Sequence, residues 1–166
     1  RDWEALSLVD DLTDLYNRRG FTTLAEQQLK VSQHSQQRLW LLFADMDGLK
    51  QINDTLNHQA GSRALIDLAQ LLKASFREVD IIARLGGDEF VVLAEAESEQ
   101  AMQQLLERFY ANLEEFNRSP ARPYRLATSI GMAEFDPAQP CTLEELITQA
   151  DLRMYADKRA RKVARV

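Results

Sequence analysis

The sequence has little cysteine, no long apolar run and fewer basic than acidic residues. Cys141 is its only cysteine, which excludes an intrachain disulfide and a thiolate metal cluster and is typical of a reducing compartment. No apolar run approaches the roughly 20 residues that cross a bilayer, and the start of the chain lacks the pattern of a signal peptide. The formal net charge of -6 argues against general nucleic-acid binding, which needs clustered Lys and Arg. We therefore expect a cytoplasmic domain that contacts neither nucleic acid nor membrane, although a few placed cations could still hold a small anion.

Turn-forming residues are also few, with 6 Gly and 4 Pro, and there is no repeat or low-complexity tract. The 166 residues are 45% hydrophobic and 28% charged, which is typical of one globular domain with a single core. We expect this domain over residues 13–166. Residues 1–12 are interpreted as the end of an N-terminal linker helix, because apolar residues recur there at a spacing of three. These residues are Trp3, Leu6, Val9 and Leu12.

Helical and extended patterns alternate along the chain. The predicted helices cover residues 21–36, 61–76, 99–117 and 142–158, and the predicted strands cover residues 39–44, 81–84, 90–93 and 124–133. Ser62 is expected to cap the second helix or to lie in its first turn. Gly86 and Gly87 separate two strand-like segments, a pattern typical of a tight antiparallel hairpin. The sequence therefore predicts an α+β fold with a central, mainly antiparallel sheet flanked by helices.

Four carboxylates fall where two of these strands end. Asp45 and Asp47 follow the apolar strand, and Asp88 and Glu89 follow the glycine pair. If the strands are neighbours, the carboxylates lie near one sheet edge. Mg²⁺ prefers oxygen ligands and usually takes one or two carboxylates together with substrate phosphates, so the pattern favours a nucleotide and metal site. The simpler alternative is that acidic residues merely end strands and fill turns.

Longer strings carry a resemblance to a known family. They are RLGGDEF at 84–90, DMDGLKQIND at 45–54, DDLTDLYNRR at 10–19, and ADLRMY at 150–155 followed by Lys158. Together they resemble the GGDEF family of diguanylate cyclases over essentially the whole chain. The resemblance implies a fold related to the palm of nucleotide polymerases and to class III nucleotidyl cyclases.

The resemblance also implies roles for individual residues. Metal binding, by Mg²⁺ or alternatively Mn²⁺, would fall to Asp45, the Met46 carbonyl, Asp88 and Glu89. Triphosphate binding would involve the backbone of Gly48, Leu49 and Lys50, the close approach at Gly86 and Gly87, and the side chains of Lys158 and Lys162. Asn53 and Ser62 would face the base. Asp88 and Glu89 would be the catalytic carboxylates, with Asp88 the favoured candidate for general base.

The implied reaction joins two nucleoside triphosphates. The 3′-hydroxyl of one attacks the α-phosphorus of the other, and pyrophosphate leaves. Because each domain of this family holds one nucleotide, the resemblance implies a catalytic homodimer with GTP as substrate. The chain begins at Arg1 rather than Met, from which we expect a fragment of a longer protein with an upstream sensory domain.

Ser62 departs from the family pattern, which has Asp at this position. Aspartate accepts hydrogen bonds from guanine and repels the bare N1 of adenine, whereas a hydroxyl can donate or accept. The hybrid promiscuous subgroup carries Ser here and makes cyclic AMP-GMP beside cyclic di-GMP. The resemblance therefore implies ATP as a second substrate. The alternative is that Ser62 only caps its helix and GTP remains the sole substrate.

Arg77 and Asp80 have the spacing of the family's inhibitory site for the cyclic dinucleotide product. An Arg fork suits the Hoogsteen edge of guanine, and Asp can accept from the base. The structural alternative is an ordinary ion pair between a helix end and a strand start. For the whole domain, the rival to an enzyme is a non-catalytic GGDEF module that binds nucleotide and signals through protein contacts; a plain adenylyl or guanylyl cyclase is disfavoured by the hairpin sequence.

Overall fold

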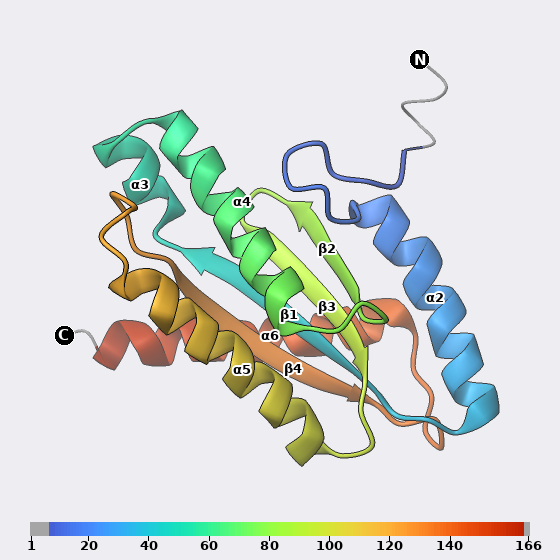
Figure 1. Cartoon of the computed structure of the whole chain (residues 1–166). Coiled ribbons are helices and arrows are strands. Elements are labelled where there is room, and N and C mark those ends of the chain that lie inside the picture. Colours follow the sequence, from blue (N-terminus) through green and yellow to red (C-terminus); the bar gives the residue numbers. More distant parts are fainter. Residues whose placement is uncertain (1–6, 165–166) are drawn as a thin grey trace.

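A four-stranded antiparallel sheet forms the centre of the molecule (Figure 1). The structure is a computed structural model that describes residues 7–164. The sheet has the order β2-β3-β1-β4, and its strands are β1 (Leu39–Asp47), β2 (Ile81–Gly86), β3 (Glu89–Glu95) and β4 (Ala127–Phe135). The helices are α2 (Arg18–Ser35), α3 (Leu49–Thr55), α4 (His58–Ser75), α5 (Glu99–Arg118) and α6 (Leu143–Ala164). The predicted α+β class and antiparallel sheet are confirmed.

Helices cover both faces of the sheet and bury two apolar layers. α4 and α5 lie over one face and α2 and α6 over the other (Figure 1). Successive side chains of the central strand β1 alternate between the layers, since Leu42 and Ala44 pack on the α4 and α5 side while Leu41 and Phe43 pack on the α2 and α6 side. This explains why β1 is a continuous apolar run, because a strand buried on both faces needs apolar residues at every position. Within residues 7–164, no helix is long and apolar enough to cross a membrane.

The start of α4 corrects one prediction. The helix begins at His58, and the side chain of Asn57 caps it by accepting a hydrogen bond from the Ala60 N–H at 2.7 Å. Ser62 therefore lies beyond the first turn and caps nothing. Asn and Ser are comparable as caps, and the helix starts three residues earlier than the predicted residue 61.

The helix α3 was not predicted from the sequence, and it has only 7 residues. It follows β1 directly, after Gly48 adopts a left-handed φ of 75°. Glycine reaches that conformation without the steric penalty that a side chain would impose. The turn brings α3 against α4 at the end of β1 that carries the aspartates.

The segment before α2 also differs from its prediction. None of residues 7–12 is helical. Val9 bridges to Tyr16 across a turn at residues 11–13, and Tyr16 bridges to Ala83 of β2. A linker helix is therefore wrong for residues 7–12, whereas Trp3 and Leu6 lie outside the described residues. The boundary at residue 13 stays a prediction, although Asp10 already contacts the folded domain through Arg84.

Close contact with β4 holds α6 in place. A Cβ added to Gly131 would lie 2.1 Å from the Ala150 carbonyl oxygen and 2.1 Å from the Met154 amide nitrogen. Only a residue without a side chain allows the strand and helix to approach this closely. The approach sets the position of the later turns of α6, which carry Lys158 and Lys162.

Candidate active site

The end of β1 and the hairpin between β2 and β3 lie side by side. Asp45 is paired with Glu89 across the antiparallel strands, and the Met46 N–H donates to the Asp88 carbonyl at 2.9 Å. The predicted neighbourhood of the two acidic pairs is therefore observed. It depends on the β1 and β3 pairing, which a sequence pattern alone does not specify.

The hairpin turn depends on both glycines, and a hydrogen bond from the Arg84 side chain stabilises it. Gly86 and Gly87 have φ values of 146° and 49°, both unfavourable for residues with a Cβ. Arg84 donates through Nε to the Gly87 carbonyl at 2.9 Å and through Nη1 to Asp10 at 3.1 Å. The largely buried ion pair with Asp10 thus connects the turn before α2 to the hairpin tip.

Asp45 and Asp47 are held by neighbouring polar groups. The Lys158 ammonium lies 2.7 Å from Asp45 Oδ2 and 3.8 Å from Asp47 Oδ1. Ser129 of β4 donates its hydroxyl to Asp47 Oδ2 at 2.8 Å. The Oδ1 atoms of both aspartates are buried without a hydrogen-bond partner in the described part of the chain. Two acceptor oxygens therefore stay unsatisfied, a costly arrangement for buried carboxylates.

Burial changes the proton affinity of these groups. It raises the pKa of Asp45 above its ordinary value; Lys158 opposes the rise and the neighbouring Asp88 adds to it. Burial likewise raises the pKa of Glu89, with further contributions from Asp151 and Asp45. The Lys158 pKa is raised chiefly by its hydrogen bond to Asp45. The strand ends thus concentrate negative charge that one ammonium offsets only in part.

These residues fit a divalent cation shared with a substrate. Among residues 7–164, no three Asp, Glu, His or Cys side chains are gathered so as to enclose a metal by themselves. Mg²⁺ does not require such a cage, because it commonly takes one or two carboxylates and completes its shell with water and phosphate oxygens. The unpaired buried oxygen of Asp45 and its proximity to Asp88 supply the hard donors that this arrangement needs.

A cavity of about 350 Å³ opens beside the end of β1. One wall is the turn from β1 into α3, where backbone N–H groups can form an anion nest, and α6 contributes cationic side chains opposite. The lining residues are Met46, Asp47, Gly48, Leu49, Lys50, Gln51, Asp88, Lys158, Arg161 and Lys162. The cavity combines carboxylates with cations, which suits a phosphate chain carrying a metal ion.

Most of the residues predicted for phosphate and metal meet at this cavity. Asp45, Glu89, Gly86 and Gly87 belong to the adjoining strand and hairpin but not to its lining. Sequence reasoning gave no role to Gln51 or Arg161. Arg161 could have been found from its spacing, since it follows Lys158 by three positions on a helix and such residues share a face.

The two residues predicted to face the base come from adjoining helices. Asn53 of α3 lies against Gly61 of α4, where an added Cβ would be 1.8 Å from Asn53 Oδ1, and Ser62 is the next residue. Ser62 lines a shallow depression of about 300 Å³ formed by α4 residues, which does not include Asn53. The structure thus brings the two backbone positions together without showing one cavity that both side chains line.

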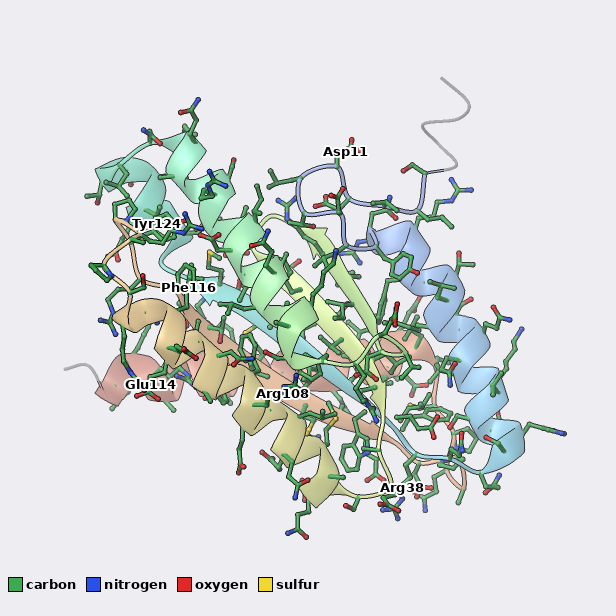
Figure 2. The ribbon with its side chains drawn as sticks, viewed as in Figure 1. Asp11, Arg38, Arg108, Glu114, Phe116 and Tyr124 are labelled. Atoms are coloured by element: carbon green, nitrogen blue, oxygen red, sulfur yellow. The ribbon has the colours of Figure 1, made fainter. Side chains whose placement is uncertain are left out.

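Arg77 and Asp80 are bound to one another. The Arg77 side chain donates to both carboxylate oxygens of Asp80, at 3.2 and 3.0 Å, and also to the Glu95 carbonyl. The Asp80 side chain is nearly fully buried, whereas that of Arg77 is 44% exposed. Arg77 lines a cavity of about 830 Å³ together with Arg38 and Arg108. Figure 2 labels Arg38, just before β1, and Arg108, on α5. The ion-pair alternative is therefore what this structure displays, and product binding stays a prediction.

Comparison with known proteins places this site in a family. The family model for the GGDEF domain of diguanylate cyclases matches residues 7–163. The chain is 36% identical to the bifunctional diguanylate cyclase and cyclic di-GMP phosphodiesterase MucR of Pseudomonas aeruginosa, over 95% of this chain and 23% of MucR. It is 37% identical to the probable diguanylate cyclase DgcJ of Escherichia coli, over 92% of this chain and 29% of DgcJ. The chain belongs to the GGDEF diguanylate cyclase family.

Solved structures agree with this assignment. The GGDEF domain of TpbB, also called YfiN, from Pseudomonas aeruginosa is similar with a TM-score of 0.82 and 33% identity, over 92% of this chain and 89% of that domain. The chain thus matches nearly all of an isolated GGDEF domain but spans only about a quarter of the length of the two curated relatives above. The resemblance read from the sequence motifs is confirmed at the level of the family.

The raised pKa of Asp45 predicts a pH-dependent difference between the wild-type protein and Asp45→Asn. At pH values below the pKa of the unfolded chain, the Asp45 carboxyl is protonated in both the folded and the unfolded protein. Because its pKa is higher in the folded protein, its ionisation at higher pH costs more free energy there and lowers the stability of wild type. We expect the unfolding free energy of Asp45→Asn to increase relative to wild type as the pH rises from about 4 to 7. Urea unfolding in the presence of a chelator measures this difference, and parallel pH profiles would contradict it.

Proposed function

We propose that this domain condenses two purine nucleoside triphosphates into a 3′,5′-cyclic dinucleotide with release of pyrophosphate, making cyclic di-GMP from GTP. The observation that carries the proposal is the cavity at the end of β1, where Asp47 and Asp88 face Lys158 and Lys162 beside the buried Asp45. Carboxylates for a metal and cations for phosphates are the parts that phosphoryl-type transfer requires. Relatives named as diguanylate cyclases support the same reaction.

The chain's own residues would bind the triphosphate and orient it. The backbone from Gly48 to Lys50 holds phosphate oxygens, and Lys158 and Lys162 neutralise charge on the leaving pyrophosphate. Asp45, the Met46 carbonyl, Asp88 and Glu89 would hold Mg²⁺, or alternatively Mn²⁺. When bound, the ion would supply charge neutralisation and acidify the attacking hydroxyl. The Asp88 carboxylate then accepts the proton of the 3′-hydroxyl as general base.

A complete reaction needs a second copy of the domain. One cavity of about 350 Å³ at the end of β1 suits the phosphates of one nucleotide, so the attacking hydroxyl would come from a nucleotide on another copy facing it. We therefore propose a catalytic homodimer. We also propose that it lies in the cytoplasm and is part of a longer protein with an upstream sensory domain.

The need for two copies predicts how the rate depends on concentration. The rate of cyclic di-GMP formation should rise more steeply than linearly with the concentration of the isolated domain.

Pyrophosphate release tests the proposed reaction. The wild-type domain at high concentration, with Mg²⁺ and GTP, should release pyrophosphate and form cyclic di-GMP, whereas Asp88→Asn should lower the rate about a hundredfold or more because a general base is lost. Glu115→Gln removes an exposed carboxylate from α5 and serves as the control. If wild type binds GTP without releasing pyrophosphate, the domain is instead a non-catalytic nucleotide-binding module.

We propose further that ATP is a second substrate and that cyclic AMP-GMP is a second product. Ser62 supports this proposal because the structure removes its competing role: Asn57, rather than Ser62, caps α4. No hydrogen bond of the Ser62 hydroxyl is found among residues 7–164, so this hydroxyl is available to a base as donor or acceptor. The alternative is a strict diguanylate cyclase that uses GTP alone.

A competition experiment tests this base selectivity. With equal GTP and ATP, the wild-type domain should form both dinucleotides, and Ser62→Asp should favour guanine by on the order of 1 to 3 kcal/mol because it restores a charged acceptor. Gln70→Asp places the same charge at an exposed position of α4 away from the depression that Ser62 lines, and should leave the product ratio unchanged. Separation of the products by chromatography gives the ratio. If wild type forms no mixed dinucleotide, the proposal fails and the enzyme is a strict diguanylate cyclase that uses GTP alone.

We also propose that the cyclic dinucleotide product inhibits the enzyme by binding at Arg77 and Asp80. Arg77 is partly exposed and shares its cavity with Arg38 and Arg108. The three arginines outnumber Glu95 and Glu97 in the lining of a space large enough for a dianionic ligand. Binding would require the Arg77 fork to exchange part of its bonding with Asp80 and the Glu95 carbonyl for the ligand.

Inhibition by added cyclic di-GMP tests the second site. For wild type, the ratio of inhibited to uninhibited rate should fall as the dinucleotide concentration rises. For Arg77→Ala this ratio should stay near one, because the guanidinium that binds the base edge is absent. Arg118→Ala, which removes an exposed arginine paired with Glu114, is the matched control. Unchanged inhibition of Arg77→Ala would exclude the site.

A further inference from the structure

Arg161 is the third cation that α6 contributes to the cavity at the end of β1. It lies on α6 between Lys158 and Lys162 in the sequence, and all three side chains line the space beside the Gly48 turn. The roles proposed above for triphosphate binding do not include Arg161. Unlike a mobile surface lysine, its guanidinium is held by contacts to Asp157 of its own helix and to Tyr110 of α5.

Two side chains hold Arg161 in place. Its Nε donates to Asp157 Oδ2 at 3.0 Å, and its Nη2 donates to the Tyr110 hydroxyl of α5 at 3.2 Å. The guanidinium carbon lies 5.6 Å from the centre of the Tyr110 ring, within the range of a cation-π contact. Asp157 Oδ2 also accepts the Ile130 N–H of β4 at 2.9 Å. The group is thus tied to the sheet and to α5 as well as to its own helix.

The remaining N–H groups of Arg161 are available to a ligand. Nη1 has no hydrogen-bond partner among the described residues, and the residue lines the cavity. Asp157 offsets part of the positive charge, but Lys158 and Lys162 add theirs on the same wall. A planar guanidinium with free N–H groups matches phosphate oxygens well, and one that is already held loses little conformational freedom on binding.

We propose that Arg161 contacts the phosphate chain of the substrate and that Asp157 and Tyr110 are its positioning residues. This inference rests on the proposed function, because it assigns a further contact to the same nucleotide site. The competing explanation is that Arg161 only ties α6 to α5 and β4. The two differ in their effects. Loss of a phosphate contact weakens the triphosphate selectively and leaves thermal stability unchanged, whereas loss of a structural tie loosens α6 and lowers thermal stability together with any affinity that depends on its lysines.

Binding of two guanine nucleotides separates these explanations. The probes are guanosine 5′-[α,β-methylene]triphosphate and GMP, titrated by calorimetry with Mg²⁺ into wild type, Arg161→Gln and Arg161→Lys. Arg161→Gln should weaken triphosphate binding about tenfold, the effect of losing a charge-assisted hydrogen bond, while changing GMP binding much less. Arg161→Lys should recover part of the loss because it restores charge without the planar fork.

Two further variants keep the result interpretable. Arg159→Gln removes a neighbouring arginine that stacks on Tyr155 and does not line the cavity, so its triphosphate affinity should equal that of wild type. Tyr110→Phe keeps the ring but removes the hydroxyl tether, and should weaken the triphosphate selectively, by about two- to threefold, the modest effect of one neutral hydrogen bond. Thermal unfolding of each variant identifies any general loss of stability.

The outcomes distinguish this inference from the proposed function. Equal triphosphate affinity of Arg161→Gln and Arg159→Gln would overturn the phosphate contact, and so would equal weakening of both nucleotides. If wild type binds the triphosphate analogue but releases no pyrophosphate from GTP, the proposed reaction fails while a selective effect of Arg161→Gln still supports the contact. If wild type does not bind the analogue, both fail.

Discussion

The antiparallel pairing of β1 with β3 is the constraint on which the whole site depends. It sets Asp45 opposite Glu89 and joins the Met46 amide to the Asp88 carbonyl. Side chains alternate between the two faces of a strand, so a shift of one residue in this pairing would move Asp45 to the other face. The buried apolar residues of β1 stabilise the correct register, since the same shift would misplace Leu41 and Phe43. Packing of the core and assembly of the site are therefore specified together.

The electrostatics of the strand ends oppose folding and favour ligand binding. Asp45 is buried beside Asp88, and one of its oxygens lacks a partner within the described structure. Lys158 provides the nearest opposite charge at 2.7 Å, but an ammonium satisfies only part of the acceptor capacity of two aspartates. Carboxylates of this kind are retained at a cost in stability. A cation that arrives with a nucleotide would relieve that cost, so ligand binding and stability should rise together.

The sheet and most helices could be predicted because their patterns are local. The glycine pair at 86–87 predicted the hairpin, and the apolar run at 39–44 predicted the central strand, which extends three residues further to Asp47. The failures arose where local signals were ambiguous or short. α3 has only 7 residues, too few for a periodic pattern, and Val9 at helical spacing instead pairs with Tyr16. Ser62 was predicted to lie at the start of α4, whereas Asn57 caps the helix five residues earlier.

The site could be predicted in its chemistry but not in its full membership. Asp45, Asp88 and Lys158 were identified from motifs, and the structure places them within one neighbourhood. The three-residue spacing from Lys158 could have identified Arg161, but its contact with Tyr110, 51 positions away in sequence, could not be predicted. The relation between Asn53 and Ser62 depends on the contact between α3 and α4 at Gly61. Such long-range contacts leave no periodic trace in the sequence.

The close approach of Gly131 to α6 has a consequence for how the site can change. Because no methyl group fits between strand and helix, α6 cannot move closer to β4. A shift of the whole helix therefore cannot bring the cationic side chains of α6 closer to the strand ends. Accommodation of different nucleotides must then come from side-chain rotation or from the α3 turn on the opposite wall. Variation of the residues at positions 158, 161 and 162 should accordingly retune the cavity without remodelling the backbone beneath it.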